Sequence, residues 1–305
     1  MHLLSVLCMF KNESTIIKEW IEHYISEGID HFYLIDNGST DDYHSQIKDY
    51  TNLITLVVDP TRLPKGTQRT LYNKHFFEII KKETEFILPC DIDEYVYSRN
   101  GYKTIKDFLE KSEYDAIWIP WKLFGTNGIS TPNSIVQSLT KRKKDFVQET
   151  DKLKGMGKTI TRTSKILMLN LHQCKVLEGI KFVRFDYNSD LNLNHYKLIS
   201  EEYYKNVKCV RGGGNNGLNK KDYTMEYFRE KQQDYSEVKD KELKRKKESS
   251  TTIIIPYRPN DIRKGQLKYF IDNSVSLLIK HIPKCKILIV EQDFTNELFN
   301  RGLLI

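Results

Sequence analysis

Two carboxylates separated by one residue follow a strongly apolar segment near the end of the first hundred residues. The segment is 86–90, and the carboxylates belong to Asp91 and Asp93. Residues i and i+2 of an extended chain lie on the same side, so both carboxylates can face one cation. Hard oxygen ligands suit Mg²⁺ or Mn²⁺, which keep open positions for substrate phosphates. The spacing therefore predicts a Mn²⁺ or Mg²⁺ site at the end of a buried strand, with an Asp-rich surface turn as the alternative.

Short polar residues also follow two earlier apolar segments. Lys11, Asn12 and Glu13 come after residues 3–9, and Asp36 opens a turn after residues 31–35. Groups of this size can hydrogen-bond a uracil ring and its ribose, so we expect all four residues to bind a nucleotide donor. Helix capping by Asn12 and a simple turn after Asp36 are the alternatives.

Strands and helices are predicted to alternate through the first hundred residues. We expect strands at 3–9, 31–35, 53–58 and 85–90, and helices at 14–27 and 68–82, the first of them capped by Ser14. Buried strands that alternate with helices favour a Rossmann-like sheet, in which ligands bind beyond the carboxyl ends of the strands. The polar strand ends should therefore meet in one crevice, and Asn73 of the second helix is also expected to contact the donor.

The later chain is predicted to contain a linker and a second, smaller unit. Residues 227–250 are charged, with few large apolar side chains, which indicates a helical linker between an α/β domain over 1–226 and residues 251–305. The last segment again shows the order strand–helix–strand, but it is too short for a complete α/β domain. Within the first domain, Lys208 and Arg211 precede the glycine-rich residues 212–217 and are candidate contacts to a diphosphate.

The composition describes a globular protein. Of the 305 residues, 39% are hydrophobic and 29% are charged, and the formal net charge is +7. The basic clusters lack interleaved aromatic residues, which argues against a nucleic-acid partner. No apolar run is long enough to span a bilayer, and the first ten residues lack the basic start of a signal peptide, so we expect a cytoplasmic protein. The five cysteines are scattered, which argues against a zinc module or a disulfide framework.

Several stretches in the first 215 residues resemble glycosyltransferase family 92 and the wider family 2 group. They are residues 6–13, 19–24, 32–42, 90–96, 121–128 and 193–212, among them Cys90-Asp91-Ile92-Asp93-Glu94 and Asn194-His195-Tyr196. The resemblance implies an α/β fold of the GT-A type, a mixed sheet flanked by helices. It also implies inverting transfer of galactose or another hexose from a UDP-sugar, with a glycan or glycoprotein as acceptor.

The resemblance also implies site residues. His195 takes the part of the family's C-terminal histidine, beside the metal and the diphosphate, and His172 is its rival for this position. An inverting transferase needs a base that deprotonates the acceptor hydroxyl. Gln137 stands where the family tends to carry a glutamate, and an amide cannot act as a base. We therefore expect Asp145 to be the catalytic base, with Glu149 as the alternative.

The tail carries a second resemblance. Residues 253–258, 267–270 and 289–301 are similar to the start of a family 7 β-1,4-galactosyltransferase, but the metal motif of that family lies beyond the last residue of this sequence. We therefore expect an incomplete second GT-A-like unit that cannot form a working site.

Two other function classes compete with a glycosyltransferase. A non-catalytic nucleotide-sugar or carbohydrate-binding module would explain Gln137, and a nucleotidyltransferase would also use Asp91 and Asp93. The second class would need a glycine-rich phosphate loop after the first strand, where the sequence has Lys11, Asn12 and Glu13. The sequence does not indicate an oligomeric state.

Overall fold

The computed structural model describes residues 1–145, 156–213, 223–250, 252–257, 286–291 and 303–304. The chain divides into two compact units, Met1–Asp240 and Lys241–Ile305. In the described part of the chain, no helix is both long and apolar enough to cross a membrane.

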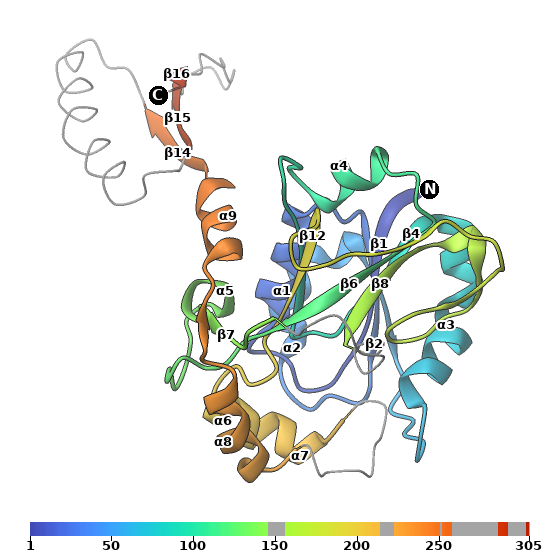
Figure 1. Ribbon diagram of the computed structural model, residues 1–305, viewed down its shortest axis with the longest axis horizontal. Helices are drawn as coiled ribbons and strands as arrows, with labels where there is room; N and C mark the ends of the chain where they lie inside the picture. Colours follow the sequence, from blue (N-terminus) through green and yellow to red (C-terminus); the bar gives the residue numbers. More distant parts are fainter. Residues whose placement is uncertain (146–155, 214–222, 251, 258–285, 292–302, 305) are drawn as a thin grey trace. The chain divides into compact units, whose positions relative to one another are not determined.

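A mixed nine-stranded sheet forms the centre of the first unit (Figure 1). Its main order is β3-β2-β1-β4-β8-β6-β12-β5, and β11 pairs with β6. The strands are β1 (His2–Phe10), β2 (His31–Asp36), β3 (Ile54–Val58), β4 (Thr84–Pro89), β5 (Glu94–Ser98), β6 (Ala116–Leu123), β8 (Gly157–Arg162), β11 (Phe182–Arg184) and β12 (Leu191–His195). The first four strands in space are parallel, whereas β8 is antiparallel to both β4 and β6. The expected mixed α/β sheet is confirmed.

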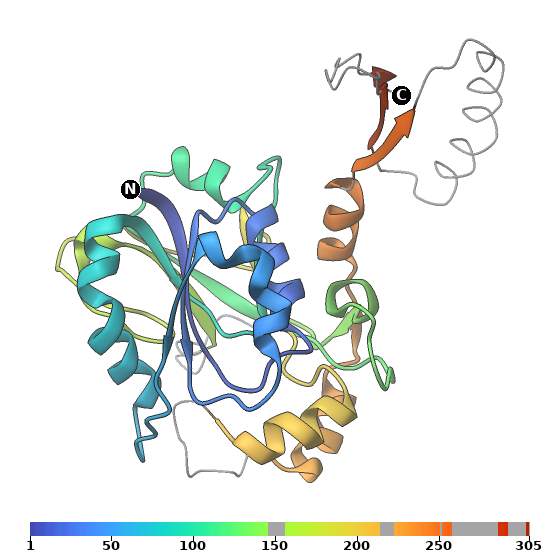
Figure 2. The ribbon, with the colours of Figure 1, turned by 180° about the vertical axis from the view of Figure 1, so that it is seen from behind.

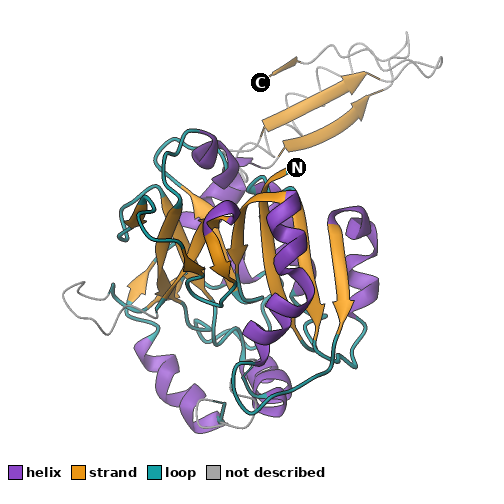
Figure 3. Ribbon diagram, turned by 90° about the vertical axis from the view of Figure 1, so that its right-hand side faces the viewer, coloured by secondary structure: helices purple, strands orange, loops and turns teal. Residues whose placement is uncertain are grey.

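Helices cover both faces of this sheet, as the rear and side views show (Figures 2 and 3). Side chains of a strand alternate between its two faces. Leu7 and Tyr33 pack against Phe76 of α3 (Thr67–Glu83), whereas Phe32 on the opposite face contacts Trp20 of α1 (Ile17–Ser26). Both strand faces are therefore buried, which explains why β1 and β2 are apolar without alternation.

The other elements of the first unit are shorter. They are α2 (Tyr43–Ile47), η1 (Lys48–Leu53), α4 (Ile105–Glu110), α5 (Ile135–Ser138), β7 (Lys141–Arg142), η3 (Thr163–Lys165), β9 (Ile166–Met168), β10 (Lys175–Val176), α6 (Glu201–Tyr203), η4 (Tyr204–Lys208), α7 (Cys209–Arg211), α8 (Met225–Asp234) and β13 (Val238–Lys239). The run α6-η4-α7 is one helix with a π-helical turn at η4.

The predicted cap of the first helix is wrong. Ser14 does not cap α1, which begins after Ile16 without a side-chain cap. The backbone N–H of Ser14 instead donates to Asp41 Oδ2 at 2.7 Å, which ties the end of β1 to the turn after β2.

The charged segment at residues 227–240 belongs to the first unit, although its composition had suggested a linker over 227–250. Phe228 and Tyr235 are buried in a cluster with Leu123, Leu198 and Tyr204. In addition, β13 pairs with β7. Met225 and Tyr227 also pack against this cluster, so α8 is fastened by its apolar and aromatic side chains although most of its residues are polar or charged.

The second unit contains α9 (Glu242–Ser250), β14 (Thr252–Tyr257), β15 (Lys286–Glu291) and β16 (Leu303–Leu304). The β14 and β15 strands are parallel, and β16 is antiparallel to β15. Arg258 and the segment 299–301, which carried much of the resemblance to family 7, lie outside the described residues.

Candidate active site

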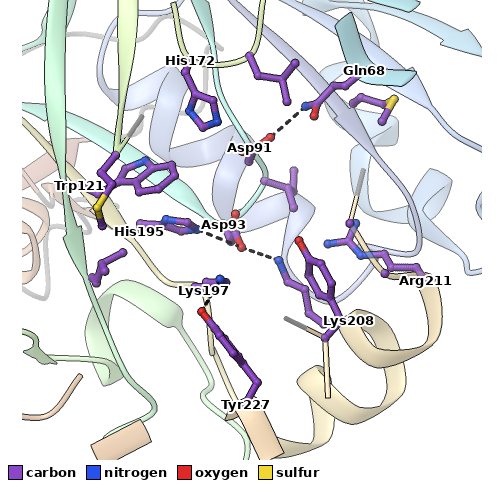
Figure 4. A pocket seen from close by; sticks show the side chains of 18 of the residues that line it. Gln68, Asp91, Asp93, Trp121, His172, His195, Lys197, Lys208, Arg211 and Tyr227 are labelled. Carbon is purple, nitrogen blue, oxygen red and sulfur yellow. Dashed lines mark hydrogen bonds and ion pairs between the residues drawn. The ribbon is translucent and has the colours of Figure 1, made fainter. Parts of the chain in front are cut away.

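A cavity of about 430 Å³ lies between the strand ends of the sheet and the helices that follow β12 (Figure 4). Residues from both sides line it. The sheet wall consists of Asp91, Asp93, Trp121, His172 and His195, and the helical wall consists of Lys208, Arg211, Tyr227 and Tyr235. Asp91, Asp93 and His195, which were predicted as metal ligands, all line this cavity, and their binding of a metal stays a prediction.

The turn that carries the two aspartates is fixed by α1. The indole Nε1 of Trp20 donates to the carbonyl oxygens of Asp91 and Glu94, both at 3.1 Å. The Glu94 carboxylate accepts a hydrogen bond from the Asp91 N–H at 2.9 Å. These bonds explain why a tryptophan lies in the first helix, since it holds the backbone from which both aspartates project.

Asp91 is paired with a buried lysine. Its Oδ2 lies 2.7 Å from Lys158 Nζ, and its Oδ1 accepts from Gln68 at 3.0 Å. Burial and the Asp93 charge raise the pKa of Asp91, but the Lys158 ammonium outweighs both and lowers it to about 2. The Lys158 side chain is 1% exposed and also lies 3.3 Å from Glu94 Oε2. Asp91 is therefore a carboxylate at any physiological pH.

Asp93 is paired with a lysine of the helical wall. Its Oδ2 lies 2.5 Å from Lys208 Nζ and 3.6 Å from His195 Nε2 (Figure 4). Burial raises the pKa of Asp93, yet the charges of Lys208 and His195 leave it well below its usual range. The two aspartates thus have the same chemistry, but their cationic partners come from opposite sides of the cavity.

Both histidines contact the ring of Trp121, His172 edge-on and His195 at a tilt. The Trp121 ring lies 4.7 Å from the ring of His195 and 5.4 Å from that of His172, measured between centroids. His172 Nδ1 lies 3.1 Å from the Gly157 carbonyl oxygen. His195 is at the end of β12, where its carbonyl accepts from the Phe124 N–H.

The helical wall is fastened to the strand ends by a buried glutamate. Glu13, which follows β1 and is fully buried, lies 2.7 Å from Arg211 Nη2 and accepts from the Tyr203 hydroxyl at 2.6 Å. Burial raises the pKa of Glu13 despite the charges of Arg211 and Lys208. At the far side, Lys197 Nζ donates to the Tyr227 hydroxyl at 2.7 Å.

A family model matches most of this chain. The model of glycosyltransferase family 92 matches residues 4–252. The chain belongs to glycosyltransferase family 92. No curated protein sequence matches it.

Similar solved structures are distant from this family 92 chain. The Staphylococcus aureus protein TarS, in a structure of its residues 1–349, is 18% identical, with a TM-score of 0.40, over 67% of this chain and 62% of that one. Glucosyl-3-phosphoglycerate synthase from Mycobacterium tuberculosis, in complex with phosphoglyceric acid, is 11% identical, with a TM-score of 0.31, over 54% and 58% of the two chains. The protein A197 from STIV is 12% identical, with a TM-score of 0.30, over 64% and 85%. This chain therefore spans less than two thirds of the length of the TarS structure.

The structure does not place all predicted donor ligands of this family 92 member at the cavity. Among the described residues, Lys11, Asn12, Glu13 and Asp36 are not part of its lining. Asn12 Oδ1 accepts from the Thr40 N–H at 2.7 Å, and Asp36 Oδ1 accepts from the Ser39 N–H at 2.7 Å. These side chains hold the two strand-end loops together, and their contact with a donor stays a prediction.

Asn73 has a structural role. Its amide donates to the Leu169 carbonyl and accepts from the Leu169 N–H, both at 2.9 Å. The side-chain amide of Asn73 therefore forms the same pair of hydrogen bonds with the backbone after β9 that a neighbouring strand would form. The structure does not bring it to the cavity.

The predicted base is also away from the cavity. Asp145 forms an ion pair with Arg142 at 2.6 Å, and Arg142 also binds Asp240 at 2.6 Å. Gln137 lies on α5, outside the described cavity lining, and Glu149 lies outside the described residues. The carboxylate of Asp145 is therefore paired with a cation three positions earlier in the sequence, at the end of β7.

Sequence reasoning did not name Gln68 and Lys197, which line the cavity, or Lys158, which is outside the described lining but pairs with Asp91. Lys158 lies in β8, which is buried although Ile160 is its only large apolar residue, and a buried lysine requires a carboxylate as partner. The composition of this strand therefore gave no signal that could have linked Lys158 to Asp91 or Glu94.

Proposed function

We propose that this glycosyltransferase moves galactose or another hexose from a UDP-sugar to a hydroxyl group of a glycan or glycoprotein, with inversion at the anomeric carbon and with Mn²⁺ or Mg²⁺. One observation carries the proposal. Two aspartates and three cationic side chains line the same cavity, the cationic ones being Lys197, Lys208 and Arg211. Acidic groups suit a divalent cation, and basic groups suit a diphosphate.

The residues present fit a cation that is shared with the donor. In the described part of the chain, no three His, Cys, Asp or Glu side chains are grouped closely enough to hold a metal alone. Asp93 and His195, with Nε2 3.6 Å from Oδ2, supply two ligands of suitable type. Mg²⁺ and Mn²⁺ in nucleotide sites commonly take further ligands from phosphates and water. When bound, the cation would neutralise charge on the diphosphate leaving group.

The chain's own residues would then bind and orient the donor. Lys208 and Arg211 stand opposite the aspartates, and both can donate to phosphate oxygens. Lys208 Nζ lies 2.5 Å from Asp93 Oδ2, and its ammonium has further N–H groups that can donate to a phosphate oxygen. Trp121, Tyr227 and Tyr235 offer apolar ring surface for the sugar rings of donor and acceptor.

Gln137 no longer favours a non-catalytic module. That alternative rested on an amide in the position of a base, and α5 is held instead by the carboxylate of Glu19 on α1, which accepts from the N–H groups of Ile135 and Val136. Gln137 is not part of the described lining of the cavity, so its amide does not weigh against catalysis.

The test is release of UDP from UDP-hexoses, with and without Mn²⁺. We expect Asp91→Asn and Asp93→Asn each to lower turnover by at least about 10²-fold, the usual effect of removing one preorganised electrostatic group. Asp49→Asn, at an exposed position of η1, is the matched control. Circular dichroism would confirm folding, and NMR of the product would give its anomeric configuration. Wild-type turnover in either cavity variant would contradict the proposal.

A further inference from the structure

The proposed transfer needs a group that takes the proton of the acceptor hydroxyl, and the carboxylates of the cavity are poor candidates. Among the described residues, only Asp91 and Asp93 bring carboxylates to the lining. Each is paired with a lysine, and the pKa of each is lowered. A carboxylate held in its charged form by an ammonium is a weak proton acceptor at neutral pH. The base is therefore to be sought among the other cavity groups.

His172 is held by a rigid backbone atom. Its Nδ1 lies 3.1 Å from the carbonyl oxygen of Gly157, the first residue of β8. A Cβ at Gly157 would lie 2.3 Å from the Ile119 carbonyl oxygen and 2.7 Å from the Trp118 ring. Only glycine fits this close approach of β8 to β6, so the carbonyl that orients His172 is fixed by the sheet.

This contact defines the tautomer of His172. A carbonyl oxygen can only accept, so the proton must be on Nδ1. In a neutral imidazole, Nε2 then carries the lone pair. No described residue forms a hydrogen bond with this nitrogen, and the ring points from the edge of the cavity toward the space between Trp121 and Asp91 (Figure 4). His172 thus presents a free proton acceptor to the cavity.

The surroundings of His172 keep the ring neutral. Burial lowers its pKa below the ordinary value of 6.5, and the charges of Lys158 on β8 and His195 on β12 act in the same direction. The charge of Asp91 and the Gly157 carbonyl oppose this shift but do not reverse it. Trp121, which packs against the ring from β6, carries no charge.

We propose that His172 is the general base of the transfer, an assignment that rests on the proposed function. The acceptor oxygen forms a bond to the anomeric carbon while its proton passes to His172 Nε2. The bond from the anomeric carbon to the diphosphate oxygen breaks, and its electron pair leaves with UDP. His172 returns the proton to solvent once the products have left.

The decisive variant is His172→Asn, because the asparagine amide nitrogen can still donate to the Gly157 carbonyl whereas the base is gone. We expect hydrolysis of the UDP-hexose to fall about 10²–10⁴-fold, the usual effect of losing a general base. Azide carries no proton to remove, so formation of the inverted glycosyl azide should stay close to the wild-type rate. His44→Asn, exposed on α2, is the control. An equal loss in both reactions, or in neither, would overturn the proposal.

The pH profile gives a second readout. The reaction requires unprotonated His172, so the wild-type rate should fall as the pH drops through the pKa of His172, below 6.5. This acidic limb should be absent from His172→Asn.

A third measurement does not depend on turnover. Long-range ¹H–¹⁵N NMR of the wild-type protein, with His172→Asn used to assign the signal, should show a neutral ring at pH 7 with the proton on Nδ1. A protonated ring, or a proton on Nε2, overturns the assignment even if no UDP-hexose is hydrolysed. Absence of hydrolysis in the wild type, by contrast, would count against the proposed function.

Discussion

The two walls of the cavity hold their functional groups in different ways. On the sheet wall, backbone hydrogen bonds fix the reactive residues, as Trp20 does for the Asp91 carbonyl and Gly157 for His172. On the helical wall, the cations are fixed by the acids they face, as Lys208 is by Asp93. A bound anion can therefore compete for the groups of the helical wall, whereas it cannot displace those of the sheet wall.

Two lysines of the site differ in the same way, one being fixed by the sheet and the other free to exchange its partner. Lys158 and Lys208 each pair with one of the two aspartates, and their side chains are 1% and 8% exposed. Lys158 lies on the central strand β8 between the carboxylates of Asp91 and Glu94. Its ammonium also donates to the carbonyl oxygen of Leu171, which holds the side chain in place. Lys208 stands on a π-helical turn and contacts one carboxylate. We infer that Lys158 stabilises the fold and that Lys208 binds ligand.

The largest effect is expected from Lys158→Met. Removing one partner of a buried ion pair leaves an uncompensated charge, which usually costs about 3–5 kcal/mol of unfolding free energy. Urea denaturation at pH 7 would measure this loss. Burial already raises the pKa of Glu94. As the pH falls toward 5, Glu94 should therefore take up a proton and lose its unpaired charge. The loss of unfolding free energy caused by Lys158→Met should then become smaller. Lys111→Met, whose side chain is 62% exposed, should change stability by less than about 1 kcal/mol. Equal losses for the two variants would contradict the structural role of Lys158.

An intermediate effect, on binding rather than folding, is expected from Lys208→Met. A hydrogen bond to a charged group contributes about 1.5–3 kcal/mol, so the affinity for UDP should fall roughly ten- to a hundredfold. Because Asp93 is then free, the affinity for Mn²⁺ without nucleotide should rise. Isothermal titration calorimetry would measure both affinities, with Lys205→Met, exposed on the same turn, as the control. Unchanged affinity for UDP and Mn²⁺ would show that Lys208 plays the same structural part as Lys158.

The smallest effect is expected from removing residues 251–305. Both walls belong to the unit Met1–Asp240, so a chain that ends at Ser250 should retain UDP-hexose turnover within a few-fold. A steady-state comparison with the 305-residue chain would test this. Loss of donor binding in the shortened protein would mean that residues 251–305 contribute to the donor site in addition to the two walls.

The sheet wall was largely predictable from the sequence. Buried strands leave continuous apolar runs, and the polar residues that end such runs meet at one edge of a parallel sheet. This reasoning brought Asp91 and Asp93 to the strand ends, and the family resemblance added His195. The pairing of Asp91 with Lys158 was not predicted, because β8 enters the sheet antiparallel between β4 and β6, an order that local patterns do not contain.

The helical wall was harder to predict. Half of the residues in 227–240 are charged, and two contacts fasten this segment to the first unit. They are the burial of Phe228 and Tyr235 and the pairing of β13 with β7, and the composition indicates neither. Glu13 and Asn12 were expected to bind the donor, and that contact stays a prediction. The sequence did not show that Glu13 also fastens the helical wall and that Asn12 joins two strand-end loops. Asp145 was chosen because it is acidic and near Gln137, but distance along the chain does not show that Arg142 neutralises it.

The π-helical turn η4 also affects which insertions and deletions this part of the sequence can tolerate. Tyr203 and Arg211, both of which contact Glu13, are eight residues apart on either side of this turn. In a regular α-helix, eight residues advance about 80° beyond two full turns, so the two side chains would diverge. The wider turn takes up the additional residue and returns Arg211 to the face of Tyr203. Loss of one codon within residues 204–208 would leave the two positions seven residues apart, about 20° short of two full turns of a regular α-helix, so both would still face Glu13. Gain of one codon would turn Arg211 away by about 100°, so we expect a one-residue deletion in this stretch to be tolerated better than a one-residue insertion.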